Sequence, residues 1–196
     1  MRTEGSSPAE ESPVDAMVAE VDYPLFVVTT AADDEVSGCV AGFVTQCSIE
    51  PPRFLVCISK QNHSYLVAEK AAGLALHLLG AEQLEMASLF GELSGDVADK
   101  FSQCEWRAGV TGAPVLTDCA AWIEGRILHH FSVGDHAAFI MTTDHGESGP
   151  RSGQLTVKAG AVLEAGHPAT DAATEETTSR QTIGDAAHRE SGSGGA

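Results

Sequence analysis

A cluster of polar side chains lies between residues 59 and 64, directly before a segment with helical spacing. The cluster brings several hydrogen-bond donors and one cation together: Ser59, Lys60, Asn62, His63 and Ser64. Free backbone N–H groups and the helix dipole favour an anion at the start of a helix, so a monoester phosphate would suit this place. The alternative is structural: Asn62 or Ser64 caps the helix, and Lys60 is a solvated surface charge.

A second group of polar residues follows a glycine in the segment before this cluster. Thr45, Gln46 and Ser48 offer side-chain donors, and the backbone amides beside Gly42 add further donors. Donors of this kind suit the carbonyl oxygens and ring nitrogens of a planar heterocycle such as isoalloxazine. The alternative is a strand that the glycine merely kinks.

Three histidines in the later part of the chain are candidates for chemistry. Gly134-Asp135-His136 is a turn signal, and because Asp135 can orient the imidazole, His136 is the best candidate for a catalytic contact with a second substrate. The alternative for His136 is a turn or packing role. The adjacent His129 and His130 fall on opposite faces of a strand, so we expect no metal site there.

Most of the segments around these residues predict strands. Apolar alternation or β-branched runs indicate strands at residues 25–30, 36–49, 54–58, 74–79, 120–131 and 136–143, and residues 157–163 are a possible last strand. Two short helices are predicted at residues 62–72 and 82–90. Because strands and helices do not alternate regularly, we expect a mostly β fold, an antiparallel barrel of six or seven strands with two short helices.

The two ends of the chain differ from its middle in composition. Residues 1–17 and 164–196 lack periodicity, so we expect a flexible acidic arm and a disordered tail on either side of one domain at residues 18–163. Acidic residues number 28 against 11 basic ones, and the resulting charge of −17 disfavours nucleic acid and anionic membranes as partners. No apolar run approaches the length of a membrane span, which favours the cytoplasm.

Cysteine spacing gives no sign of a disulfide framework. The chain has five cysteines with no CxxC pair among them: Cys39, Cys47, Cys57, Cys104 and Cys119. We expect them to be reduced and mostly buried as small apolar residues.

Four of these features, in order and spacing, resemble the flavin reductase-like family of FMN-binding split β-barrels. They are the strand that opens at Tyr23, the 38–52 segment that ends in Ser-Ile-Glu-Pro-Pro, the 59–65 cluster, and the turn at Gly134-Asp135-His136. The resemblance covers residues 18–143. It implies that the strand before Pro51-Pro52 lies against the flavin and lines its site with Val40, Ala41, Gly42, Thr45, Gln46 and Cys47.

The resemblance also implies roles for the remaining candidates and for partners. The phosphate would be held by Ser59, Lys60, Asn62, His63 and Ser64, and His136 would contact the nicotinamide. The implied activity is NAD(P)H-dependent reduction of FMN, with FAD possible, that supplies reduced flavin to a partner monooxygenase. The family commonly forms homodimers with flavin sites near the subunit boundary.

In this mechanism NAD(P)H passes a hydride to the flavin, and the protein supplies orientation and donors instead of a nucleophile. Three alternatives remain open. One is a carrier or sensor that binds flavin or haem without catalysis, and another is an oxidoreductase that uses a deazaflavin. The last is a structural β-barrel without a cofactor.

Overall fold

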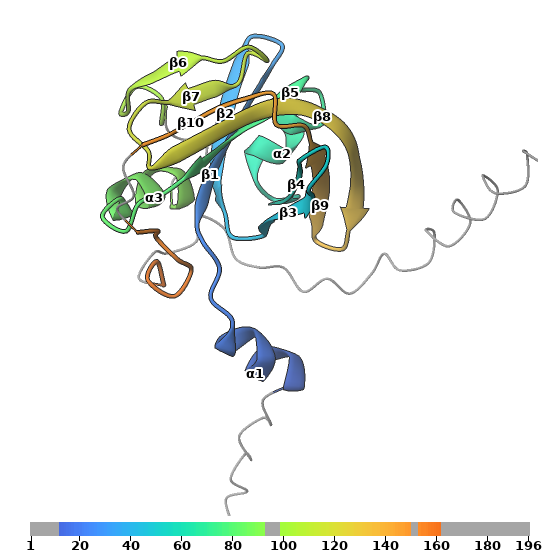
Figure 1. The fold of residues 1–196 in the computed structure, drawn as a ribbon, viewed down its shortest axis with the longest axis vertical. Helices are drawn as coiled ribbons and strands as arrows, with labels where there is room; N and C mark the ends of the chain where they lie inside the picture. Colours follow the sequence, from blue (N-terminus) through green and yellow to red (C-terminus); the bar gives the residue numbers. More distant parts are fainter. Residues whose placement is uncertain (1–11, 93–98, 150–152, 162–196) are drawn as a thin grey trace, which may run out of the picture.

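The computed structural model describes residues 12–92, 99–149 and 153–161. These residues contain ten strands and three helices. In chain order they are α1 (Pro13–Glu20), β1 (Phe26–Ala32), β2 (Glu35–Ala41), β3 (Val44–Ser48), β4 (Arg53–Ser59), α2 (His63–Ala68), β5 (Gly73–Leu78), α3 (Leu84–Gly91), β6 (Trp106–Ala108), β7 (Pro114–Leu116), β8 (Ala121–Val133), β9 (His136–Met141) and β10 (His145–Ser148). Eight strands form one antiparallel sheet in the order β2-β1-β5-β8-β9-β4-β3, with β10 on β8, while β6 pairs with β7 (Figure 1). The mostly β antiparallel barrel is confirmed, with more short strands than the six or seven expected.

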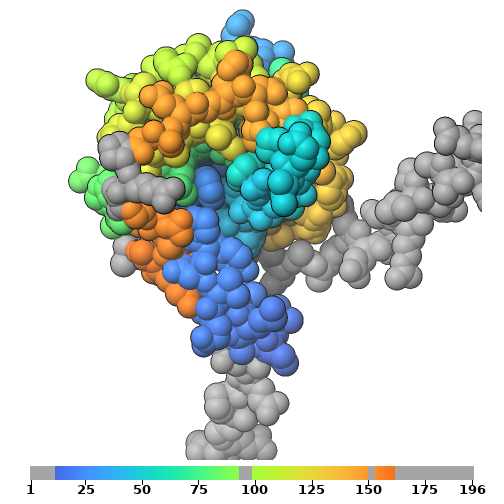
Figure 2. All heavy atoms as spheres, viewed as in Figure 1, coloured from blue at the N-terminus to red at the C-terminus, as the bar shows by residue number. Residues whose placement is uncertain are grey.

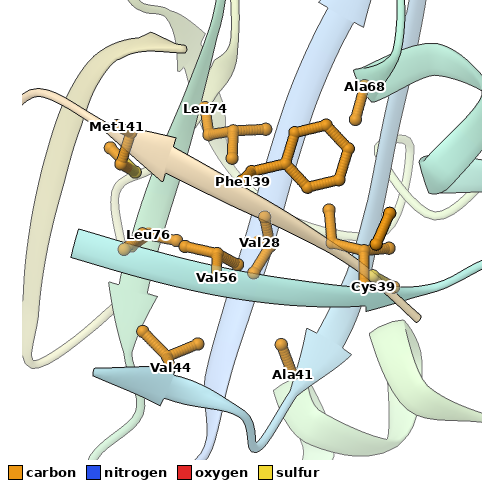
Figure 3. Close-up of a cluster of buried hydrophobic side chains, with 12 residues drawn as sticks. Val28, Cys39, Ala41, Val44, Val56, Ala68, Leu74, Leu76, Phe139 and Met141 are labelled. Carbon is orange, nitrogen blue, oxygen red and sulfur yellow. The ribbon is translucent and has the colours of Figure 1, made fainter. Parts of the chain in front are cut away.

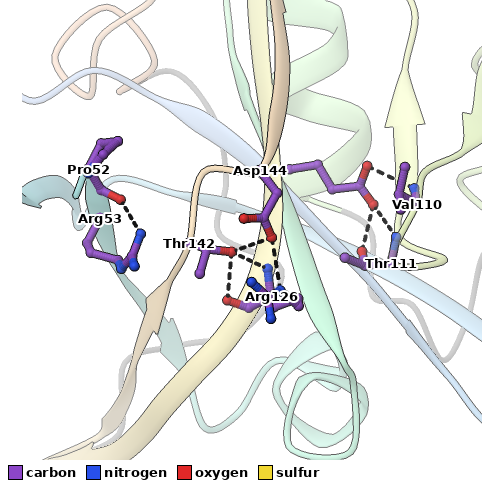
Figure 4. A network of polar contacts seen from close by, with 8 residues as sticks. Pro52, Arg53, Val110, Thr111, Arg126, Thr142 and Asp144 are labelled. Atoms are coloured by element: carbon purple, nitrogen blue, oxygen red, sulfur yellow. Dashed lines mark hydrogen bonds and ion pairs between the residues drawn. The ribbon is translucent and has the colours of Figure 1, made fainter. Parts of the chain in front are cut away.

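The long strand β8 joins the two halves of the barrel. Its first half pairs with β5 and its second half with β9, with a register shift after the junction. At the junction, a Cβ atom on Gly125 would collide with the carbonyl oxygen of Thr142, so glycine permits this close crossing. The Thr142 hydroxyl accepts from the Arg126 N–H at 2.7 Å and donates to the Asp144 carboxylate at 2.7 Å, which braces the crossing (Figure 4).

Apolar side chains from both halves fill the barrel interior. The cluster includes Val28, Val56, Leu74, Leu76, Phe139 and Met141, all of which lie within the barrel (Figure 3). On the outer face of β1, Val27 packs with Phe90 of α3 in a second cluster. Because β1 is covered on both faces, its sequence reads as a continuous β-branched run without alternation.

The segment 36–49, which the sequence predicts as one strand, forms two strands. β2 pairs with β1 whereas β3 pairs with β4, so the chain changes neighbours between them. The one-strand prediction was wrong because the pairing partners, which are distant in sequence, decide where the strand breaks. The glycines allow close packing here: a Cβ on Gly38 would lie 2.9 Å from Phe90, and one on Gly42 would lie 3.0 Å from Val157.

A helix, α1, occupies part of the segment that the sequence predicts as a flexible arm. The Ser12 hydroxyl accepts from the Val14 N–H at 3.2 Å, Pro13 fits the first turn, and the Asp15 carboxylate suits the helix dipole. None of the helical residues is buried, and α1 stands away from the barrel (Figure 1). The rest of the predicted arm, residues 1–11, and the predicted tail, residues 164–196, lie outside the described residues.

Several shorter predictions also differ from the structure. The predicted helix at 62–72 ends at Ala68, and the last strand proposed at 157–163 is an isolated bridge between Thr156 and Pro24 followed by turns as far as residue 161. Strands β6, β7 and β10 have only three or four residues each, which is too short for a periodic signal.

The cysteines are less buried than expected. All five are free, but only Cys39 is buried; Cys47 is exposed on strand β3 at the end of the sheet, and the other three are partly buried. The prediction that most are buried was wrong, since several lie at the barrel surface or in loops. Burial raises the pKa of the Cys39 thiol, and it raises the pKa of the Cys119 thiol to about 11.

A buried histidine, His77 of β5, attaches the β6–β7 hairpin to the barrel. Its Nε2 accepts the backbone N–H of Leu116 at 3.0 Å, and its Nδ1 lies 3.1 Å from the carbonyl oxygen of Val27. Because the N–H donates to Nε2, the proton resides on Nδ1 and the imidazole is neutral. Burial lowers the pKa of His77 from 6.5 to about 4.

The neutral His77 predicts an acid-sensitive stability. Its contribution is complete above pH 6.5 and is lost as the pH falls toward about 4, because only the unfolded chain takes up the proton in that range. The loss should reach roughly 3 kcal/mol in the free energy of unfolding. Asp22, Asp135 and Asp144, whose pKa values are lowered from 3.8, lose their contributions below this window.

Urea unfolding at a series of pH values checks this prediction. The variant His77→Gln should be less stable at neutral pH but should show a flatter dependence between pH 6.5 and about 4. His145→Ala, which removes an exposed histidine of β10, should retain the wild-type dependence. Equal slopes for wild type and His77→Gln would show that another group is responsible.

Candidate functional site

β2 and β3 are the two end strands of the sheet and do not pair with each other, so the barrel is open between them. We call this opening the gap. Among the described strands, β3 pairs only with β4, so its other backbone edge has no strand beside it. Three polar or thiol side chains on this strand are exposed: Thr45, Gln46 and Cys47. Strand β3 therefore presents backbone and side-chain hydrogen-bonding groups at the gap.

The second part of the site forms where β4 ends beside the β8–β9 turn. The register of β4 and β9 places Ser59 opposite His136. The Lys60 backbone N–H donates to the carbonyl oxygen of Asp135 at 3.0 Å, and the Lys60 ammonium donates to the Ser132 hydroxyl at 2.6 Å. Thus the strand pairing brings together a cation, hydroxyl groups and a histidine that are more than 70 residues apart in the sequence.

His136 is held by two neighbours. Its Nδ1 lies 2.8 Å from the Asp135 carboxylate, and the hydrogen bond from His136 lowers the pKa of that carboxyl. The ring of Phe43, at the corner between β2 and β3, contacts the imidazole with centroids 5.4 Å apart at an interplanar angle of 62°. Tyr23 packs edge-on against Phe43, with ring centroids 6.3 Å apart.

Several predicted cofactor ligands have partners inside the protein. Val40 and Ala41 pack their side chains into the two apolar clusters, so only their backbone groups are near the gap. The hydroxyl of Ser64 is buried and bonded to Ser37 at 2.9 Å, and His63 pairs with the carboxylate of Glu35. Asn62 is the N-cap residue of α2, without a side-chain capping bond.

The remaining predicted residues fall into two separate groups. Thr45, Gln46 and Cys47 lie on β3, where Thr45 pairs with Leu55 and Gln46 with Phe54, toward the start of β4. Ser59, Lys60 and His136 lie together at the other end of β4. The two groups fit a planar heterocycle with a phosphate: the outer backbone edge of β3 suits ring carbonyls, and Lys60 is a cation for the phosphate. The Thr45 hydroxyl and the Gln46 amide already donate to carbonyl oxygens within β3, at 3.4 Å and 2.9 Å. Within the described part of the chain, no group of three or more His, Cys, Asp or Glu side chains could hold a metal ion.

Sequence reasoning did not identify Phe43 as a neighbour of His136, or Tyr23 as a neighbour of Phe43. It placed Phe43 inside a continuous strand, where its exposure on the surface, 54%, is not apparent. A usable signal was the glycine directly before Phe43, which marks the corner. Tyr23 carried no comparable signal.

The fold and this cluster define an antiparallel split barrel with a polar, histidine-bearing site at its gap. A family model described as "Flavin reductase like domain" matches residues 18–162. The chain therefore belongs to the flavin reductase like domain family.

None of the helices in the described residues has the length and apolar character needed to cross a membrane.

Individual relatives agree with this family. The chain is 30% identical over 122 residues to "FMN reductase (NADH) RutF" of Stutzerimonas stutzeri, a match covering 62% of this chain and 69% of the relative. It is 32% identical over 115 residues to "Probable flavin reductase" of Rhizobium meliloti, covering 58% of this chain but only 36% of that protein. The solved structure of the Streptomyces globisporus NADH:FAD oxidoreductase SgcE6 shares the fold, with a TM-score of 0.68, 23% identity, and coverage of 82% and 96% of the two chains.

Proposed function

We propose that this chain is an NAD(P)H-dependent flavin reductase that acts on FMN and supplies reduced flavin to a partner monooxygenase. The observation that carries the proposal is the position of His136, which is oriented by Asp135 and contacts Phe43, the residue directly before the end strand β3. Membership of the family and the description of the Stutzerimonas stutzeri relative support the same activity. A cytoplasmic location stays a prediction from the sequence.

When bound, the flavin would supply the hydride-accepting chemistry, with NAD(P)H as the donor. The residues of the chain bind and orient the two nucleotides. Thr45, Gln46 and the outer backbone edge of β3 donate to the ring, and Lys60 offsets the negative charge of the phosphate. His136 would contact the nicotinamide, with its Nδ1 proton held by Asp135.

Purified full-length protein tests the proposal. After FMN is added and the free cofactor is removed by gel filtration, the visible spectrum shows whether flavin is retained, and anaerobic NADH or NADPH shows whether it is reduced. Bleaching of the flavin, or turnover of free FMN, supports the reductase. Retained flavin that neither nucleotide bleaches indicates a carrier or sensor, whereas turnover of a deazaflavin alone indicates the other cofactor class; both results contradict the proposal.

We also propose that the protein is a homodimer. The support comes from the second half of β8, which pairs with β9 along one edge and has no described strand along its other edge. Three apolar side chains of this half are exposed: Leu128 at 40%, Phe131 at 48% and Val133 at 43%. An unpaired edge with exposed apolar residues is a surface that natural proteins usually cover.

If the protein is a homodimer, a charged residue on the exposed half of β8 should halve its mass in solution. Phe131→Glu places a carboxylate on the exposed half of β8, so the variant should elute as a monomer where the wild type elutes as a dimer. Light scattering coupled to gel filtration measures both masses. Val110→Glu, at an exposed position of the β6–β7 hairpin, is the matched control and should remain dimeric. A monomeric wild type at micromolar concentration would contradict the proposal.

A further inference from the structure

Three rings from separate parts of the chain form a row at the corner between β2 and β3. Tyr23 precedes β1, Phe43 follows Gly42 at the corner, and His136 begins β9. Phe43, in the middle, is 54% exposed and belongs to none of the buried clusters in the described residues. Packing of the core therefore does not explain a large apolar side chain at this position.

The backbone that carries Phe43 is anchored on both sides. Its carbonyl oxygen accepts the Cys57 N–H at 2.9 Å, and the preceding Gly42 packs against Val157 so closely that a Cβ would lie 3.0 Å from that side chain. Tyr23, which contacts the ring, is itself fixed because its carbonyl oxygen accepts the Val157 N–H at 2.8 Å. The ring of Phe43 is thus presented from a rigid corner.

Two contacts from different segments meet on the imidazole of His136. A carboxylate accepts hydrogen bonds, so the 2.8 Å contact with Asp135 places the proton of the neutral ring on Nδ1 and leaves Nε2 as an acceptor. Asp135 is adjacent to His136 in the sequence and lies on an exposed turn. Its single hydrogen bond still allows the His136 imidazole to rotate about its side-chain torsions. The edge-on contact with Phe43 restricts that rotation.

We infer that Phe43 is a positioning residue, which holds the His136 imidazole so that Nε2 faces the second substrate. The inference rests on the proposed reductase function, because the second substrate is then NAD(P)H. Phe43 acts through His136 and needs no contact of its own with the nucleotide. Loss of the Phe43 ring should therefore weaken the use of NAD(P)H without weakening the binding of flavin.

A double-mutant cycle tests this coupling. Phe43→Ala should lower kcat/KM for NAD(P)H about 10-fold, mainly through KM, with the flavin Kd unchanged. Phe43→Ala/His136→Ala should be no worse than His136→Ala alone, because the two residues act as one unit. Phe43→Tyr keeps an aromatic ring and should have the wild-type kcat/KM for NAD(P)H. Phe43→Leu lacks the ring and should have a lower one. Val110→Ala truncates another exposed apolar side chain and is the control.

The tautomer of His136 gives a second readout that needs neither flavin nor activity. In nitrogen NMR spectra of the flavin-free protein, wild-type His136 should show a protonated Nδ1 and an unprotonated Nε2. Phe43→Ala should shift these signals toward a mixture of tautomers, while Val110→Ala should leave them unchanged. Unchanged signals in Phe43→Ala, or additive losses in the cycle, would overturn the inference. If the wild type shows no reductase activity, the proposed function fails, and the NMR comparison still decides whether Phe43 positions His136.

Discussion

Replacing His136 with alanine is expected to lower kcat/KM for NAD(P)H about 100-fold while the flavin Kd changes less than about two-fold. In the proposed function His136 contacts the nicotinamide. It lies opposite Ser59 at the end of β4, but the Lys60 ammonium offsets the phosphate charge and β3 holds the flavin ring. The His136 side chain is 24% exposed, so truncation leaves no buried polar group unpaired. The folded protein should therefore keep its stability.

Anaerobic stopped-flow mixing of the flavin-bound protein with NADH or NADPH measures this effect directly. His145→Ala serves as the control, since it removes an exposed histidine that lies on β10. Asp135→Asn should give a smaller loss, because an amide can still orient the imidazole, although it can also present its N–H₂ group to Nδ1 and favour the wrong tautomer. If His136→Ala binds flavin weakly but reduces it at the wild-type rate, His136 belongs to the flavin side of the site.

Replacing Glu124 with alanine is expected to lower the free energy of unfolding by about 3 kcal/mol, since it removes three hydrogen bonds of a buried carboxylate to partly buried donors, each worth about 1 kcal/mol. Glu124 of β8 is 1% exposed, and its carboxylate accepts the N–H groups of Val110 at 3.0 Å and Thr111 at 2.6 Å. It also accepts the Thr111 hydroxyl at 2.7 Å, and Figure 4 shows Val110 and Thr111 in this network. A Cβ on Gly109 would collide with the carboxylate, so the loop is fitted closely around Glu124.

Urea unfolding of Glu124→Ala, Glu124→Gln and Glu147→Ala at neutral pH separates the contributions. Glu124→Gln retains one acceptor oxygen and should lose about 2 kcal/mol. Glu147 is exposed on β10, and its replacement should change the free energy of unfolding by less than about 0.5 kcal/mol. A loss in Glu124→Ala as small as that of Glu147→Ala would mean that the loop finds water as an equivalent partner.

The parts of the fold that could be predicted are those where one segment carries the signal. The 120–131 and 136–143 segments correspond to β8 and β9, because alternation and the turn at Gly134 lie within about 25 residues. The break between β2 and β3 could not be predicted, since the apolar pattern continues through it and only the distant partner strands change.

The candidate site, too, could be predicted only where the signal lies within one segment. Lys60 and His136 could be selected from their residue types and local turn signals, but their proximity depends on the register of β4 with β9. The partners of His63 and Ser64 could not be predicted either, because Glu35 and Ser37 reach them from β2. Tertiary pairing of this kind is not encoded in the spacing of one segment.

The hydrogen bonds between the segment at 155–157 and the residues before β1 bring the two ends of the described domain together. Leu25 donates to the carbonyl oxygen of Leu155 at 2.8 Å, and Val157 donates to that of Tyr23 at 2.8 Å; Figure 2 shows the two segments in contact. A circular permutant that links these segments directly and opens the chain at Gly112, in the β6–β7 turn, should therefore keep the barrel intact. A domain fused directly before residue 23 or directly after residue 157 would start beside the Tyr23 end of the aromatic row, within a short tether of His136.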